Sequence, residues 1–285
     1  MAAESHKLKN FDNRVAVITG AASGIGRELA LELSRRKCHL ALCCDRNVEG
    51  LTKTAEEAMA QGVKVTSLTL DVADREAVHR WADSVAADYG KVNLVFNNAA
   101  VELVSTVEGI DYHDFERVMG VNFWGMVYGT KAFLPYLKSA GEGHIINISS
   151  VFGLMGVPAQ CAYNSAKFAM RGFTDCLREE LDMMDCGVSA TSVHPGGIKT
   201  PIIKSGRVDQ NITALELDPD VYQQRFEKRF ITSADRAARL ILRAVSRNKR
   251  RVLIGPDAFV YDLITRLLPG AYQPMMIALV RQTMR

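Results

Sequence analysis

Short apolar runs alternate along the chain with longer segments whose apolar positions recur at helical spacing. The runs that predict strands cover residues 15–18, 39–43, 63–68, 94–97, 145–149, 188–194 and 252–254. Amphipathic segments at residues 24–36, 47–61 and 74–89 predict helices between the first four strands. Strands that are apolar on both faces and alternate with helices form a parallel sheet covered on both sides. The pattern therefore predicts an α/β fold, a single doubly wound domain with a mainly parallel seven-stranded sheet.

Two segments depart from this alternation. Residues 200–231 are charged and poor in strand signals, which favours a mobile flap over the ligand crevice rather than a second domain. Residues 256–285 are strongly apolar but carry charges and are broken by two prolines. We expect residues 1–255 to form the domain. The extension would then be two short amphipathic helices that pack on the body or on a neighbouring subunit, with peripheral membrane contact as the alternative.

Composition narrows the class of protein. The 285 residues include 35 Lys and Arg against 32 Asp and Glu, and a net charge of +3 is too small to indicate a nucleic-acid partner. No apolar run reaches the roughly 18 residues of a transmembrane helix, and the first ten residues are polar. The six cysteines and six histidines are scattered without metal-ligand spacing. We therefore expect a cytoplasmic protein with reduced thiols and no metal.

A glycine-rich turn follows the first predicted strand. Gly20, Gly24 and Gly26 form the pattern TGxxxGxG, with Ser23 and Ile25 on either side of the middle glycine. Glycine lets the backbone approach a pyrophosphate, and the helix that begins here presents its N-terminus to that group. Because ligands of doubly wound folds bind at the carboxyl ends of the strands, the turn predicts a dinucleotide site of the Rossmann type.

The choice of dinucleotide depends on two adjacent residues. Asp45 ends the second predicted strand, nineteen residues after Gly26, where a carboxylate binds the adenosine ribose and repels a 2′-phosphate. Arg46 follows it, and a guanidinium there could hold that phosphate. We favour NAD and keep NADP open. The competing interpretation of Asp45 is an N-cap for the helix that begins near Asn47.

Two residues four apart in AYNSAKFA, Tyr163 and Lys167, indicate proton chemistry. Residues at this spacing share one face of a helix, so the ammonium can lie beside the phenol and stabilise its anion. Ser150 precedes Tyr163 by thirteen residues, at the end of a predicted strand. Together with the dinucleotide turn, these residues predict an enzyme that interconverts an alcohol and a carbonyl compound.

These motifs jointly resemble the short-chain dehydrogenase/reductase family, in its branch of ordinary chain length. The matching segments are TGAASGIG, LDV at residues 70–72, NNAA at 97–100, VNFWG around Asn122, ISS ending at Ser150, YNSAK at 163–167 and HPGGIKT at 194–200. The resemblance is close over residues 10–200 and looser as far as residue 254. Ala100 is a departure, because the family usually has glycine there.

The resemblance implies a catalytic tetrad of Asn122, Ser150, Tyr163 and Lys167. Tyr163 would exchange a proton with the substrate oxygen, and Ser150 would donate a hydrogen bond to that oxygen. Lys167 would bind the nicotinamide ribose and lower the pKa of Tyr163 from its ordinary value of about 10. Asn122 would hold a water molecule in a proton relay.

The resemblance also implies a set of cofactor contacts and an assembly. The cofactor-binding residues would be Gly20, Ser23, Gly24, Ile25, Gly26, Asp45, Arg46, Asp71, Val72, Asn98, Ala99, Tyr163, Lys167, Pro195, Gly196, Ile198 and Thr200. Helices at residues 122–138 and 162–184 resemble the subunit-contact helices of the family. A homodimer or homotetramer is therefore expected.

Apolar residues surround the predicted catalytic positions. Residues 151–158 are apolar, and so are Val101, Leu103, Val104, Ile202 and Ile203. This composition favours a lipophilic alcohol, aldehyde or ketone as the small-molecule substrate. An NADPH-dependent 3-oxoacyl thioester reductase is the alternative within the family. A dinucleotide-sensing scaffold without turnover is the alternative from another class of protein.

Overall fold

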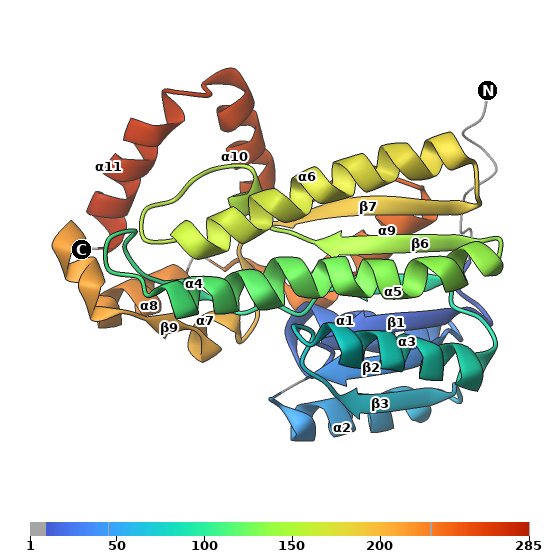
Figure 1. Cartoon of the computed structure of the whole chain (residues 1–285). Coiled ribbons are helices and arrows are strands. Elements are labelled where there is room, and N and C mark those ends of the chain that lie inside the picture. Colours follow the sequence, from blue (N-terminus) through green and yellow to red (C-terminus); the bar gives the residue numbers. More distant parts are fainter. Residues whose placement is uncertain (1–9, 45, 229, 285) are drawn as a thin grey trace.

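A sheet of parallel strands forms the centre of the computed structural model, which describes residues 10–44, 46–228 and 230–284. Its strands in the described residues are β1 (Val15–Thr19), β2 (His39–Cys44), β3 (Val65–Thr69), β4 (Leu94–Asn97), β6 (Gly143–Ile148), β7 (Val188–Pro195) and β11 (Arg251–Ile254). Their order is β11-β7-β6-β4-β1-β2-β3, and every pairing is parallel. Val17, for example, lies opposite Ala41 on one side and Val95 on the other. The seven-stranded α/β fold is confirmed (Figure 1).

Helices cover both faces of the sheet because successive strand residues point to opposite faces. The helices on one face are α1 (Gly24–Arg35), α2 (Val48–Met59) and α9 (Ala234–Ser246), and on the other α3 (Arg75–Tyr89), α5 (Gly125–Ser139) and α6 (Cys161–Met184). Ile18 packs with Leu29 of α1 in the first core. Val17 packs with Trp81 of α3 and Phe133 of α5 in the second. The second layer, with α5 and α6, lies toward the viewer in Figure 1.

Small differences from the predicted bounds have local causes. The third strand begins at Val65 rather than residue 63, and α2 ends at Met59 rather than residue 61. Gly62 has a φ of +78°, and its N–H donates to the Met59 carbonyl at 2.8 Å. This left-handed glycine ends the helix, and residues 63 and 64 connect the turn to the strand.

The segment predicted as a flap carries short elements of its own. These are β8 (Ile198–Lys199), α7 (Ile202–Ser205), β9 (Arg207–Val208), a 3₁₀-helix η3 (Gln210–Leu215), α8 (Pro219–Glu227) and β10 (Thr232–Ser233). β9 pairs with β5 (Leu103–Val104), and β8 pairs with β10. Ile212, Leu217 and Tyr222 form a small core with the end of the chain. The segment is therefore packed over the ends of the strands.

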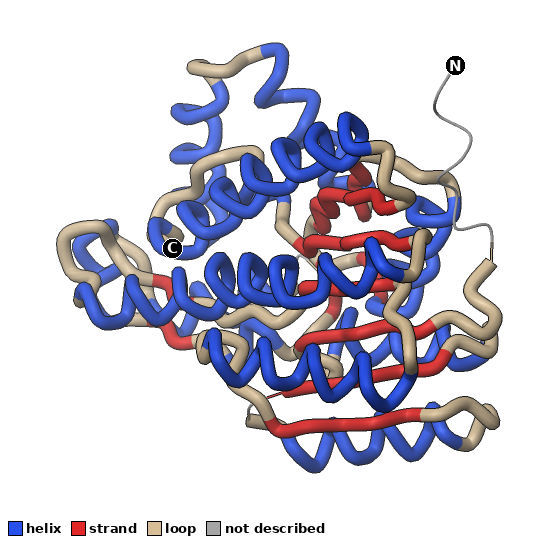
Figure 2. The backbone as a smooth tube through the Cα atoms, turned by 45° about the vertical axis from the view of Figure 1, so that its right-hand side comes forward, coloured by secondary structure: helices blue, strands red, loops and turns tan. Residues whose placement is uncertain are grey.

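Residues beyond β11 form α10 (Pro256–Leu267) and α11 (Tyr272–Met284). α10 contacts β11, and α11 contacts α8, where Val280 and Met284 join the small core around Tyr222. Figures 1 and 2 show this pair of helices on the opposite side of the molecule from β3. None of the helices in the described residues has the length and apolar character needed to span a membrane.

Candidate active site

A cavity of about 640 Å³ opens at the carboxyl ends of the strands. Its volume falls in the range of roughly 300–1,000 Å³ that is usual for ligand sites. The turn after β1, the ends of β4, β6 and β7, and the first turns of α6 contribute to its wall. Residues from α8, α10 and α11 complete the wall, and the Phe226 ring of α8 packs against Phe152, which contacts the Tyr163 ring.

The glycine turn has the shape that a pyrophosphate requires. Gly20 and Gly24 have φ values of +66° and +54°, which L-residues rarely adopt. A Cβ at position 20 would lie 2.9 Å from the Ala99 Cα. The Asn98 side chain donates to the Thr19 carbonyl at 2.9 Å and so ties the end of β4 to the turn. The turn leads directly into the N-terminus of α1, whose free N–H groups fit a bound phosphate group.

Most of the predicted cofactor residues share this one cavity. Those that line it are Gly20, Ser23, Gly24, Ile25, Arg46, Asp71, Val72, Asn98, Ala99, Tyr163, Lys167, Pro195, Gly196, Ile198 and Thr200. Gly26 lies behind the wall, where a Cβ would collide with the Gly20 carbonyl and the Asn98 amide. Asp45 lies outside the described residues. Asn47 caps α2 by accepting from the Gly50 N–H at 2.9 Å, so the capping role weighed for Asp45 belongs to Asn47.

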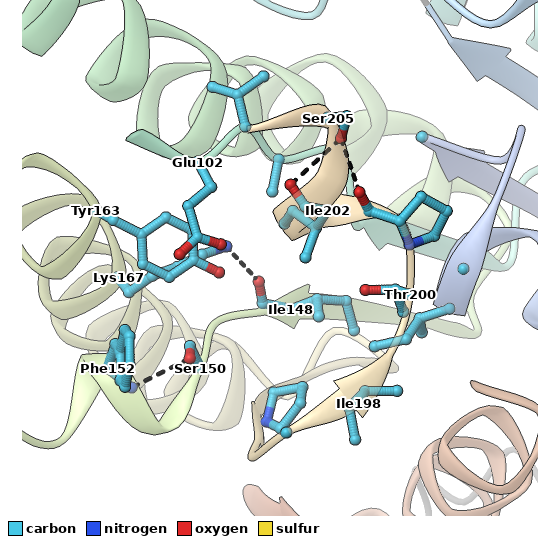
Figure 3. Close-up of a pocket in the computed structure, with 18 of the residues that line it drawn as sticks. Glu102, Ile148, Ser150, Phe152, Tyr163, Lys167, Ile198, Thr200, Ile202 and Ser205 are labelled. Atoms are coloured by element: carbon cyan, nitrogen blue, oxygen red, sulfur yellow. Dashed lines mark hydrogen bonds between the residues drawn. The ribbon is translucent and has the colours of Figure 1, made fainter. Parts of the chain in front are cut away.

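Ser150, Tyr163 and Lys167 meet on the cavity wall where β6 ends (Figure 3). Ser150 follows β6, and its Oγ accepts from the Phe152 N–H at 3.1 Å. His194 of β7 holds the Ser150 carbonyl at 3.0 Å through its Nδ1. Lys167 is 1% exposed, and its Nζ donates to the Ile148 carbonyl at 2.9 Å. The strand therefore fixes both Ser150 and Lys167.

Burial controls the ionisation of the two helix residues. It raises the pKa of Tyr163 well above its ordinary value, although a hydrogen bond with Ser150 opposes the rise. It lowers the pKa of Lys167 to about 7, and the negative charge of Glu102 opposes that change. Desolvation is the largest cause of the shift at Tyr163, and the negative charge of Glu102 adds to it.

Asn122 occupies a different place from the other three predicted catalytic residues. It lies in a π-helical turn, η1 (Gly120–Trp124), between α4 (Tyr112–Met119) and α5, and it is completely buried. Its Nδ2 donates to the Val101 carbonyl at 2.9 Å, and its Oδ1 accepts from the Val101 N–H at 2.8 Å. Asn122 is not part of the cavity wall. Its side chain instead fixes the backbone of Val101, which does line the cavity.

Two acidic residues of the site escaped the sequence analysis. Glu102 lines the cavity near Tyr163 and Lys167, and its only sequence signal is that it interrupts the apolar run 101–104. Asp257, at the start of α10, also lines the cavity and accepts from the Gly197 N–H at 2.7 Å through Oδ2. Asp257 thus holds the turn that follows β7, a contact between residues sixty positions apart.

The far wall of the cavity is apolar. Of the residues expected around the substrate, Val101, Val151, Phe152, Met155, Val157 and Ile202 line it. Leu103 and Val104 instead point into separate cores, and the side chain of Ile203 is outside the description. This apolar wall also contains residues that the sequence did not predict, namely Tyr222, Phe226, Phe230, Tyr261, Met276, Leu279, Val280 and Met284.

A parallel doubly wound sheet, a glycine turn and a Ser-Tyr-Lys group in one cavity define a dinucleotide-dependent oxidoreductase as the class of protein. Residues 14–211 match the short chain dehydrogenase family. The chain belongs to this family, and it is an oxidoreductase.

Named relatives span nearly the whole chain. SadH of Mycobacterium tuberculosis, which is named as an oxidoreductase, is 44% identical over 272 residues, covering 95% of this chain and 96% of SadH. YxnA of Bacillus subtilis, named as an uncharacterized oxidoreductase, is 33% identical over 92% of this chain and 71% of its own. Dehydrogenase/reductase SDR family member 7B of Mus musculus is 31% identical over 95% of this chain and 82% of its own.

Solved structures share the fold. A short-chain dehydrogenase/reductase of Burkholderia phymatum in complex with NAD superposes with a TM-score of 0.84 at 27% identity, covering 92% of this chain and 96% of that one. An alcohol dehydrogenase of the archaeon Thermococcus sibiricus, complexed with 5-hydroxy-NADP, gives 0.68 at 27% identity, covering 85% and 95% of the two chains.

Proposed function

We propose that the protein uses a nicotinamide dinucleotide to interconvert a lipophilic alcohol and its aldehyde or ketone, with Tyr163 as the acid and base. One observation carries the proposal. The Ser150, Tyr163 and Lys167 head groups lie on the wall of a single cavity whose one end is a glycine turn and whose other end is apolar. The first end suits a dinucleotide and the second a lipophilic substrate.

The residues present fit the cofactor. The glycine turn would hold the pyrophosphate, Asp71 and Val72 would border the adenine, and the turn after β7 would border the nicotinamide. When bound, the nicotinamide supplies C4 as donor or acceptor of hydride. We infer NAD as the preferred form from the carboxylate of Asp45. The NAD complex of the Burkholderia phymatum relative supports NAD, whereas Arg46 on the cavity wall and the 5-hydroxy-NADP complex support NADP as the alternative.

Proton transfer belongs to Tyr163. In reduction its phenol donates the proton to the carbonyl oxygen, and in oxidation its phenolate takes the proton from the alcohol. Ser150 Oγ donates a hydrogen bond to the same substrate oxygen and so orients it. Because burial raises the pKa of Tyr163, the phenol is protonated at neutral pH, and this protonated form is the one that reduction needs.

Lys167 and Asn122 support proton transfer without contacting the substrate oxygen. Lys167 Nζ uses the Ile148 carbonyl as one acceptor, which leaves donors for the ribose of the cofactor. The side chain of Asn122 is bound to Val101, and its predicted relay water would have to use its second amide hydrogen or its backbone carbonyl. We therefore assign Asn122 first to fixing the wall beside Ala100 and Glu102.

An assembly of identical subunits fits the surface of two helical segments. Trp124 in η1, Phe168 in α6 and Met183 near the end of α6 are exposed by 47%, 42% and 87%. Large apolar side chains exposed along neighbouring helices are typical of subunit contacts. They support the homodimer or homotetramer predicted from the sequence.

The proposed function is tested by binding and turnover. The purified protein is titrated with NADH and with NADPH by intrinsic fluorescence, and then assayed with aliphatic, aromatic and polyol alcohols and the matching carbonyl compounds. We expect tighter binding of NADH and higher kcat/KM for aliphatic or aromatic substrates than for polyols. Higher kcat/KM for polyols would contradict the lipophilic substrate, and tighter NADPH binding would promote the reductase alternative.

A further inference from the structure

Glu102 places a carboxyl group in the part of the cavity where the reaction would occur. It lies between Val101, which Asn122 holds, and β5, and it is only 6% exposed although it lines the cavity. Figure 3 shows its carboxyl group pointing toward the head groups of Tyr163 and Lys167. A buried acid at this position needs partners, because burial of a charged or polar group without them is costly.

The described residues satisfy only half of this carboxyl group. Gln160 Nε2 donates to Glu102 Oε1 at 3.0 Å, and the described part of the chain offers Oε2 no donor. Lys167, the nearby cation, makes no ion pair with it in the described residues, because Nζ contacts the Ile148 carbonyl and the Met170 sulfur. Gln160 is itself completely buried, and its Oε1 lacks a partner among the described atoms. Because Glu102 lines the cavity, a molecule bound there can supply the donor for Oε2.

We infer that Glu102 is a second polar anchor for the substrate, and that its free oxygen accepts a hydrogen bond from a hydroxyl group near the reacting carbon. The inference rests on the proposed function and names its substrate class more closely. Such a substrate has a lipophilic body for the wall formed by α8 and α11 and a further hydroxyl within one or two carbons of the reacting one.

Charge favours a hydroxyl group over an amine as this donor. Glu102 and Lys167 are opposite charges in a desolvated site, and they balance each other when both are ionised. An ammonium group would add a second cation without a second carboxylate, which is unfavourable in a low dielectric. A hydroxyl group supplies the donor that Oε2 lacks and adds no charge.

Ionisation of Glu102 makes this contact dependent on pH. Burial raises its pKa to about 7, against the opposing effects of Gln160 and Lys167. The facing groups are Tyr163 and Lys167 of α6 and Tyr222 of α8, while the Arg207 guanidinium of β9 bonds Asp114 and Asp209 instead. The carboxylate is the stronger acceptor. Preference for the hydroxyl-bearing substrate therefore rises as the pH rises through about 7.

Matched alcohols test the inference. The pairs 2-octanol with 1,2-octanediol and 2-decanol with 1,2-decanediol differ only in the added hydroxyl, and kcat/KM is measured for the wild type, Glu102→Gln and Glu108→Gln. Glu108, exposed and six positions further along the chain, is the matched control. We expect Glu102→Gln to lower kcat/KM for the diols by about tenfold to a hundredfold, the effect of a hydrogen bond to a charged group. This loss is measured relative to the matched monoalcohol, because the charge of Glu102 also acts on Tyr163 and Lys167, and Glu108→Gln should leave the ratio of diol to monoalcohol unchanged.

Other outcomes overturn the inference. An equal loss for diol and monoalcohol would assign Glu102 to the charge balance of Lys167, and no loss for either would leave it without a role in the reaction. Faster turnover of 1-amino-2-octanol than of 1,2-octanediol would show that Glu102 binds an amine rather than a hydroxyl group of the substrate. If Glu102→Gln does not fold, the ratio of kcat/KM for the diol to that for the monoalcohol is measured with the wild type between pH 6 and pH 8. A ratio that does not change with pH contradicts the contact.

Failure of the proposed function gives a different result. In that case no alcohol of either kind is oxidised, or turnover survives in Tyr163→Phe. Turnover of 2-octanol that requires Tyr163, together with a diol ratio that Glu102→Gln leaves unchanged, refutes only the role of Glu102.

Discussion

The Lys167 ammonium lies 5.4 Å from the centroid of the Tyr163 ring, over its face, while it donates to the Ile148 carbonyl. The two residues are one turn apart on α6, and the strand end holds the lysine in place. A cation over an aromatic face is attracted by the ring quadrupole, so the pair keeps its geometry without a direct hydrogen bond. The Tyr163 hydroxyl is thereby left for Ser150 and the substrate.

Loss of the Tyr163 hydroxyl should stop proton transfer and leave the fold intact. We expect Tyr163→Phe to lower kcat by about 10²–10⁴ while NADH still binds, because the ring packing remains. Steady-state kinetics and fluorescence titration measure the two effects. Tyr112→Phe, at a position 87% exposed, is the control. Full turnover by a folded Tyr163→Phe protein would refute the proposed role.

The glycine turn can be tested by comparing two glycines with similar backbone angles. Gly20 and Gly62 have φ values of +66° and +78°, but a Cβ at position 20 would lie 2.9 Å from the Ala99 Cα, whereas none of the described atoms lies within 4 Å of one at position 62. Both alanine variants should lose about 1 kcal/mol of unfolding free energy from strain. Only Gly20→Ala should also lose NADH affinity, by at least about tenfold. Equal NADH affinity in the two variants would remove the turn from the cofactor site.

Cofactor preference should respond to Asp45 and Arg46 in opposite directions. We expect Asp45→Ala to raise KM for NAD about tenfold and to improve turnover with NADP, because the carboxylate that repels a 2′-phosphate is gone. Arg46→Ala should weaken NADP without a comparable effect on NAD. Kinetics with both cofactors measure the ratio. An unchanged ratio in Asp45→Ala would show that another residue selects the cofactor.

Asp257 should affect the cofactor through the turn that it holds. Asp257→Ala removes the acceptor of the Gly197 N–H and leaves the backbone beside Pro195 and Gly196 without its anchor. We expect NADH affinity to fall about tenfold, as for the loss of a hydrogen bond to a charged group. Asp220→Ala, at an exposed position in α8, is the control. Wild-type affinity in Asp257→Ala would show that the turn keeps its shape without this contact.

Acid should destabilise the protein through a buried histidine away from the cavity. Burial lowers the pKa of His144 to about 3, so the unfolded chain takes up the proton at a higher pH than the folded one does. The stability from this group is complete above pH 6.5 and is lost as the pH falls toward 3. At pH 5 the loss is about 2 kcal/mol. Urea unfolding at pH 5 and pH 8 should show a smaller difference for His144→Leu than for the wild type, and equal differences would contradict the prediction.

Local sequence patterns were sufficient to predict much of the fold and part of the site. Each strand was found because apolar side chains on both faces of a strand leave a continuous run, as in residues 94–97. Tyr163 and Lys167 were found because four-residue spacing places side chains on one helix face. Such signals lie within a few neighbouring residues, and tertiary contacts changed their ends by only one to three positions, as at Gly62.

Tertiary structure alone decided the rest. Glu102 meets Gln160, and Asp257 meets Gly197, across separations of 58 and 60 residues, and no local pattern encodes such pairs. The apolar wall from α8 and α11 has the same composition as a core helix, so only packing shows which side chains face the cavity. The sequence by itself determined the sheet, the glycine turn and the Tyr163–Lys167 pair, because these depend on backbone period and local geometry. Only the tertiary structure placed a half-satisfied carboxyl group beside them, because burial and hydrogen bonding depend on the whole chain.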